Sequence, residues 1–165
     1  MKGNKCACAP QREYSAIRYV FALVYGAVIA LTLVFFTEVA VLAIGLSAVI
    51  LFTVIIVPII EEAAKVAPIT MGSNTRDCVM IAILSAFGFG LGEFFFHSVY
   101  TLGTGGSLTF SITPFMHILF TLPAGYIYGT SISSGNRSSR ALIAAYTVAV
   151  LLHATYNLVV LVAIS

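Results

Sequence analysis

Five apolar segments, each long enough to cross a lipid bilayer as a helix, fill most of this chain. A spanning helix needs about 20 mainly apolar residues, because the hydrocarbon core of a bilayer is about 30 Å thick. The segments cover residues 17–36, 39–60 or beyond, 78–100, 108–129 and 141–164. They predict an all-α, polytopic membrane bundle of about five transmembrane helices. We expect one membrane domain over residues 17–165, preceded by a cytoplasmic tail of residues 1–16.

The composition supports a multi-pass integral protein of the cell membrane. Apolar residues make up 60% of the 165 residues and charged residues only 8%, whereas a soluble domain carries about 25% charged residues. So few charges could not cover the chain with a hydrated surface. The net charge of +2 is too small to indicate a nucleic-acid partner. The expected surroundings are therefore a lipid bilayer.

The positions of the basic residues predict the orientation, because cytoplasmic connections are enriched in lysine and arginine. The basic residues lie in the tail, the second connection and the fourth connection: Lys2, Lys5, Arg12, Arg18, Lys65, Arg76, Arg137 and Arg140. The first connection, expected at Thr37-Glu38, and the third connection contain none. We therefore expect the N-terminus in the cytoplasm and the C-terminus outside.

Six ionisable residues lie in or next to the last four apolar segments, where charge is costly. A charged side chain at the bilayer centre costs roughly 2.5–3.5 kcal/mol even on mild insertion scales, so such residues usually mark a function. They are Glu61, Glu62, Glu93, His97, His117 and His153. The first segment has no such residue between Arg18 and Glu38. The chemistry is therefore expected in helices two to five.

Depth along the helices brings five of these residues to a similar level. At a rise of about 1.5 Å per residue, His117 and His153 lie about 18 Å from the cytoplasmic ends of their helices, and Glu93 about 22 Å. Glu61 and Glu62 reach roughly 14–15 Å only if the second helix continues past residue 60. We therefore expect these side chains within roughly 10 Å of one another, around one polar cavity open toward the cytoplasm.

The second helix must then be long and deformed. A helix over residues 39–71 would be about 50 Å long, so it has to tilt, break near Pro58 or Pro68, or begin outside the bilayer. The four-residue spacing of Glu61 and Lys65 places both on one helix face and favours the continuation.

Glycines and prolines predict close packing around these side chains. Gly88 and Gly92 form a small-xxx-small pair, which lets another helix approach closely. Pro114 and Pro123 flank His117 and free backbone groups in the fourth helix. Those groups need partners in a polar cavity or on a neighbouring helix.

Carboxylates and imidazoles gathered in an apolar cavity suit hydrolysis. They can deprotonate a water molecule, or they can bind a divalent metal ion such as zinc that acidifies it. The candidate metal ligands are Glu62, Glu93, His117 and His153. Three carboxylates in one such cavity require either a cation among them or a shared proton. Lys65 could balance Glu61, leaving Glu62 and Glu93 to share a proton or a metal.

Two further spacings place polar side chains on common helix faces. Glu93 and His97 are four residues apart, as are His153 and Asn157. His97 lies near the outer end of its helix, which favours an interfacial role. His153 and Asn157 could donate hydrogen bonds to an oxyanion, although Asn157 could also simply tie two helices together.

Four motifs in this order resemble the signature of PrsW-type intramembrane proteases. They are Glu61-Glu62-Ala63-Ala64-Lys65, then Phe89 with Glu93, then His117, then His153 with Asn157. The chain is similar more broadly to the superfamily of CAAX-prenyl endopeptidases and bacteriocin-immunity membrane proteins. The CAAX branch has an arginine one position after that of Lys65, and a histidine at the position of Glu93. Both differences point to the PrsW branch.

The resemblance implies a helical endopeptidase that cuts membrane-anchored proteins such as anti-sigma factors. It implies that Glu61 or Glu62 activates water, that Glu93 and His117 assist or act as ligands, and that His153 and Asn157 stabilise the oxyanion. The small scaffold is compatible with a homo-oligomer. Two other functions fit the residues: a non-catalytic scaffold or immunity protein of the same superfamily, and a small proton or metal-ion transporter. Transporters often contain an internal repeat, and none is visible in this sequence.

Overall fold

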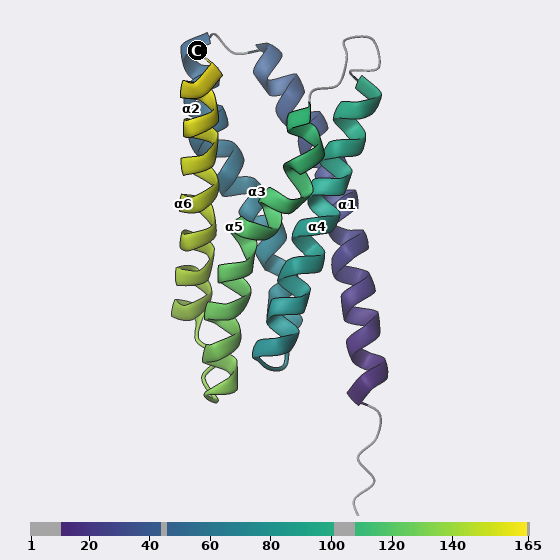
Figure 1. Cartoon of the computed structure of the whole chain (residues 1–165). Helices are drawn as coiled ribbons and strands as arrows, with labels where there is room; N and C mark the ends of the chain where they lie inside the picture. Colours follow the sequence, from purple (N-terminus) through teal and green to yellow (C-terminus); the bar gives the residue numbers. More distant parts are fainter. Residues whose placement is uncertain (1–10, 44–45, 101–107, 165) are drawn as a thin grey trace, which may run out of the picture.

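The computed structural model describes residues 11–43, 46–100 and 108–164, and these residues form a bundle of helices (Figure 1). The elements are α1 (Gln11–Ala43), α2 (Leu46–Leu51), η1 (Phe52–Ile56), α3 (Val57–Val66), η2 (Ala67–Met71), α4 (Thr75–Tyr100), α5 (Leu108–Ser133) and α6 (Ser139–Ile164). The predicted all-α fold is confirmed. The last three predicted helices agree with α4, α5 and α6 to within a few residues.

The first helix is longer than predicted. The expected break at Thr37-Glu38 is wrong, because α1 continues without interruption to Ala43. Neither residue breaks a helix: glutamate is a good helix former, and the Thr37 hydroxyl donates to the Val34 carbonyl at 2.9 Å within the helix. Polarity alone therefore did not mark a turn.

The second predicted helix is the long, deformed one that the depth of the glutamates required. From Leu46 the chain stays helical to Met71 through α2, η1, α3 and η2. The η1 segment is a π-helix that ends just before Pro58, and η2 is a 3₁₀ helix that contains Pro68. Each proline lacks a backbone N–H and its ring crowds the preceding turn, so the helix changes its winding there instead of ending.

Helix α4 lies in the centre and packs against α1 on one side and α5 on the other. Its glycines make both approaches possible. A Cβ atom at Gly88 would overlap the Leu23 carbonyl of α1, whereas a Cβ atom at Gly90 would overlap the Cα atom of Pro114 on α5. The predicted close packing at Gly88 and Gly92 is confirmed, with α1 as the partner.

The chain runs back and forth between the two ends of the bundle (Figure 1). The start of α1 and the turns after η2 and α5 lie at one end, and the ends of α1, α4 and α6 lie at the other. Within the part of the chain that the structure describes, three stretches are long and apolar enough to cross a membrane: Ala16–Thr37, Thr75–Val99 and Ser139–Ala163. The predicted location of one basic residue is wrong: Lys65 does not lie in a connection but is fully buried in α3.

We expect reporter fusions after Ser107 and at Ser165 to report the external side. Arg18, Arg76, Arg137 and Arg140 remain near the end where α1 begins, and arginine-rich ends stay in the cytoplasm. Paired alkaline phosphatase and green fluorescent protein fusions measure this. Cytoplasmic fluorescence from the C-terminal fusion would contradict the predicted orientation.

Candidate active site

A buried lysine lies at the centre of the candidate site. The Nζ atom of Lys65 is 2.6 Å from Oε1 of Glu62, 2.7 Å from Nδ1 of His117 and 3.7 Å from Oε2 of Glu61. It also lies 4.7 Å from the centre of the Phe89 ring, over its face, where a cation is attracted. The predicted pairing of Lys65 with Glu61 is therefore secondary, because the shorter contact is made with Glu62 three residues away.

The Glu62 carboxylate is fully buried and its oxygens are occupied. Oε1 accepts hydrogen bonds from Lys65 at 2.6 Å and from Nδ1 of His153 at 2.9 Å. Oε2 accepts from the hydroxyl of Thr121 at 2.9 Å. These bonds join α3 to α5 and α6, and they compensate the cost of burying the charge.

The contacts of His117 determine where its ring proton lies. A lysine ammonium group only donates hydrogen bonds, so Nδ1 of His117 accepts from Lys65 at 2.7 Å. The proton of the neutral ring then lies on Nε2, which donates to Oε2 of Glu93 at 2.5 Å. Gly90 permits this contact, because a side chain there would overlap Pro114 and separate α4 from α5.

His153 on α6 is held in a similar way by a different carboxylate. Its Nδ1 donates to Oε1 of Glu62 at 2.9 Å and lies 3.9 Å from Oε2 of Glu61. The Phe120 ring stacks on the imidazole with a centroid distance of 4.9 Å. With its proton on Nδ1, the neutral ring keeps a lone pair on Nε2. Each histidine thus donates one N–H to a carboxylate.

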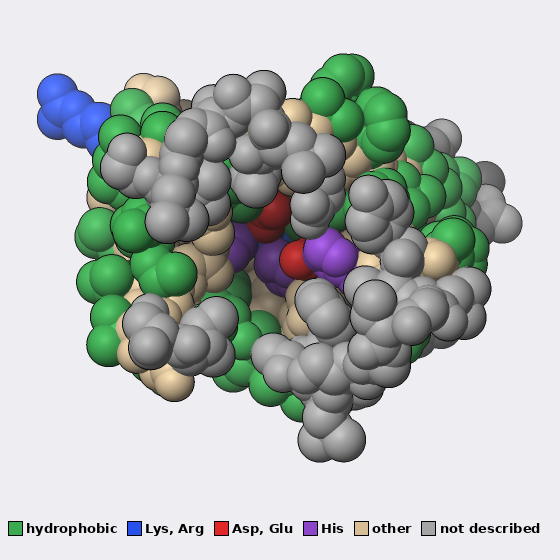
Figure 2. Space-filling view, turned by 90° about the horizontal axis from the view of Figure 1, so that it is seen from above, with side chains coloured by type: hydrophobic (Ala, Val, Ile, Leu, Met, Phe, Trp, Pro, Cys, Tyr) green, Lys and Arg blue, Asp and Glu red, His purple; other side chains and the backbone are tan. Residues whose placement is uncertain are grey.

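A polar cavity of about 200 Å³ lies beside this cluster. It is lined by side chains of α1, η1, α3, α4 and α6: Val34, Thr37, Thr53, Val57, Glu61, Glu93, His97, His153 and Asn157. Seen from the end at which α1, α4 and α6 finish, glutamate and histidine atoms are visible at the bottom of a hollow (Figure 2). The cavity therefore faces the end opposite the start of α1. With a cytoplasmic N-terminus this end would be external, so the predicted cytoplasmic N-terminus and the predicted opening of the cavity toward the cytoplasm are not compatible with each other.

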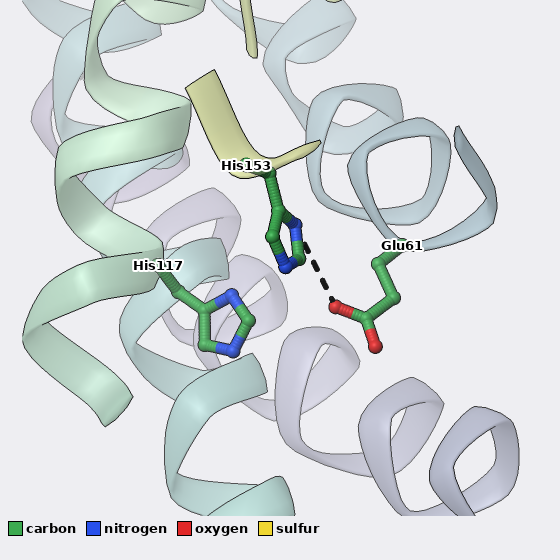
Figure 3. Close-up of side chains that lie close together, drawn as sticks. All are labelled: Glu61, His117 and His153. Carbon is green, nitrogen blue, oxygen red and sulfur yellow. Dashed lines mark ion pairs between the residues drawn. The ribbon is translucent and has the colours of Figure 1, made fainter. Parts of the chain in front are cut away.

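Three side chains in this cluster could hold a metal ion together. Glu61, His117 and His153 each offer one ligand atom, and these atoms lie within 4.8 Å of one another. Their side chains come from three helices and point toward a common centre (Figure 3). The predicted ligand set shares both histidines with this group. The carboxylate of this group belongs to Glu61. The predicted ligands Glu62 and Glu93 instead accept hydrogen bonds from His153 and His117, respectively.

Two other candidate residues lie at the cavity. Nδ2 of Asn157 donates to the Thr53 carbonyl at 3.0 Å, which ties α6 to the π-helical segment η1. Nε2 of His97 lies 3.8 Å from Oε1 of Glu93, on the same face of α4. Asn157 therefore does connect two helices, and His97 contacts a cavity carboxylate.

Two residues of the site, Thr121 and Phe120, were not among the predicted candidates. Both contact the site from α5, Thr121 through Glu62 and Phe120 through His153. Phe120 and Thr121 follow His117 by three and four residues, respectively, so they share its helix face. That spacing was the available signal.

Comparison with known proteins identifies the family of the chain. No curated protein and no solved structure matches the chain. The family model described as PrsW family intramembrane metalloprotease matches residues 15–165, which is nearly the whole chain and contains every residue of the cluster. Its metalloprotease description suits a donor group of one carboxylate and two imidazoles inside a bundle of apolar helices. The chain therefore belongs to the PrsW family of intramembrane metalloproteases.

Proposed function

We propose that this protein is an endopeptidase that hydrolyses peptide bonds of membrane-anchored proteins. The observation that carries the proposal is the polar cavity lined by Glu61, Glu93 and His153 within an apolar helical bundle. Placing charged groups at this depth is costly, so their convergence favours a catalytic role over a purely structural one. Family membership adds the reaction class.

Glu61 rather than Glu62 is the reactive member of the glutamate pair. Glu61 lines the cavity, and its contacts with Lys65 and His153 are long, at 3.7 and 3.9 Å. Glu62 does not line the cavity, and its oxygens already accept three hydrogen bonds. Glu62 is therefore a positioning residue that orients His153.

The donor group fits a divalent metal ion such as zinc. Catalytic zinc sites use three protein ligands, commonly histidines with a carboxylate, and keep a fourth position open. Glu61, His117 and His153 would hold the ion. When bound, it would polarise the scissile carbonyl and acidify the attacking water. The charge also fits: three carboxylates and one ammonium group give the cluster a net charge of −2 when its histidines are neutral.

The remaining cavity residues have complementary roles in this proposal. Oε2 of Glu93 is bonded to His117, whereas Oε1 lies at the longer distance of 3.8 Å from Nε2 of His97. Oε1 would take the proton of the attacking water and deliver it to the leaving amine. Asn157 uses its amide group on the Thr53 carbonyl, and its second N–H can donate to the oxyanion. His153 would act as a metal ligand whose ring is oriented by its hydrogen bond to Glu62.

The proposal also locates the cut. Because the hollow faces the ends of α1, α4 and α6, the scissile bond would enter from that side of the membrane. The substrate would therefore be cut near the corresponding end of its membrane anchor.

Cleavage by purified protein tests the proposal. We expect fluorescent single-span substrates in detergent or liposomes to be cut, and exhaustive treatment with a strong chelator to reduce cleavage to background. Adding Zn²⁺ back should restore it, because the ion supplies the acidified water. Undiminished cleavage after chelation, with no metal found by elemental analysis, would contradict the metal site and leave a glutamate-activated water.

A further inference from the structure

The two histidines differ in what occupies their second nitrogen. Each imidazole donates one N–H to a carboxylate, His153 to Glu62 and His117 to Glu93. This is the arrangement of metal-binding histidines, whose outer nitrogen is usually held by a carboxylate. The nitrogen left for a metal is Nε2 in His153 and Nδ1 in His117. The Lys65 ammonium group lies 2.7 Å from that Nδ1 atom.

We propose that Lys65 competes with the divalent cation for His117. Its ammonium group occupies the lone pair of Nδ1 and must withdraw before His117 can become a ligand. The inference rests on the metal site of the proposed function and adds a built-in competitor to it. Lys65 would thus lower the affinity of the site for the cation and hold the cluster together when the cation is absent.

Charge strengthens the competition. The ammonium group is also 3.7 Å from Oε2 of Glu61, the carboxylate of the proposed donor group. A divalent cation bound by Glu61 and His117 would therefore lie close to a positive charge in a buried site, where repulsion is poorly screened. Lys65 is fully buried, so water does not weaken this effect.

The test is the double variant Lys65→Met/Glu62→Gln. Removing Lys65 alone would leave a buried carboxylate without its cation, which is strongly destabilising. Removing both charges keeps the net charge of the cluster at −2, because one positive and one negative group are lost. The amide oxygen of glutamine can still accept from Nδ1 of His153. A change in metal affinity then reports the release of His117.

We expect the double variant to bind Zn²⁺ about 10–100-fold more tightly than Glu62→Gln alone, the range by which groups around metal ligands change affinity. Equilibrium dialysis with elemental analysis measures this without any cleavage assay. Glu62→Gln alone is the matched control. It carries the same glutamine but retains Lys65, so it should not bind Zn²⁺ more tightly than the wild type.

The outcomes separate this inference from the proposed function. Zn²⁺ binding by the double variant that is equal to or weaker than binding by Glu62→Gln alone would overturn the competition and leave the metal site intact. Absence of Zn²⁺ binding in both the wild type and the double variant would overturn the inference and the metal site together. If the double variant does not fold, the wild type gives a second measurement: saturating Zn²⁺ should shift the ¹⁵N signal of Nδ1 of His117, which exchanges the Lys65 ammonium group for the cation. An unchanged signal would overturn the competition.

Discussion

Glu61→Gln is expected to lower the rate of peptide cleavage by about 10²–10⁴-fold, because the site loses its carboxylate ligand and with it the ion that acidifies the attacking water. Glutamine keeps the size of the side chain but removes the negative charge that faces the cavity. Because the contacts of Glu61 are long, its loss should leave the thermal unfolding midpoint nearly unchanged. Single-turnover cleavage of a reconstituted substrate measures the effect.

Glu62→Gln is the matched comparison, one residue away on the same helix. It should lower cleavage by about 10–100-fold, as expected for a group that orients a metal-binding histidine. It should also lower the unfolding midpoint, because Lys65 loses its closest charged partner. The ¹⁵N shifts of the His153 ring should change with it, a readout that a general packing role would not move. A larger activity loss in Glu62→Gln than in Glu61→Gln would reverse these assignments.

The sequence predicted the helices well where hydrophobicity and helix breakers agree. Apolar length alone located α4, α5 and α6. The continuation of the second helix to Met71 followed from a requirement that Glu61 and Glu62 reach the depth of the histidines. The break at Thr37-Glu38 was wrong because helix ends in an apolar chain depend on how neighbouring helices pack, and neither residue prevents a helix.

The residues of the site were predictable from the sequence, but which of them contact one another was not. Sequence spacing places Lys65 near both Glu61 and Glu62, since residues three and four apart share a helix face. Which carboxylate receives the ammonium group depends on His117 and Thr121, which come from another helix. The direction in which the cavity opens also depends on the tilt of whole helices. No local pattern in the chain carries that information.

The glycine-rich run before Glu93 shows the same limit and leads to the last prediction. Spacing identified Gly88 and Gly92 as a helix-packing pair, and they do pack against α1. The glycine between them faces α5 instead. A methyl group at position 90 would overlap the Cα atom of Pro114 and lie 3.1 Å from Cδ2 of His117. The active-site contact between α4 and α5 therefore depends on Gly90.

Gly90→Ala is expected to destabilise the protein by about 1–3 kcal/mol, the usual cost of overpacking, and to reduce cleavage by about 10²-fold. The activity loss follows because the added methyl group pushes α5 away and shifts His117, and a displacement of about 1 Å in a catalytic site can cost that much. Gly88→Ala is the matched control, since its methyl group would overlap the Leu23 carbonyl on α1, away from His117. It should cost similar stability with a much smaller loss of activity. Equal activity losses in the two variants, measured at equal fractions of folded protein, would contradict a specific role for the contact of Gly90 with α5 near His117.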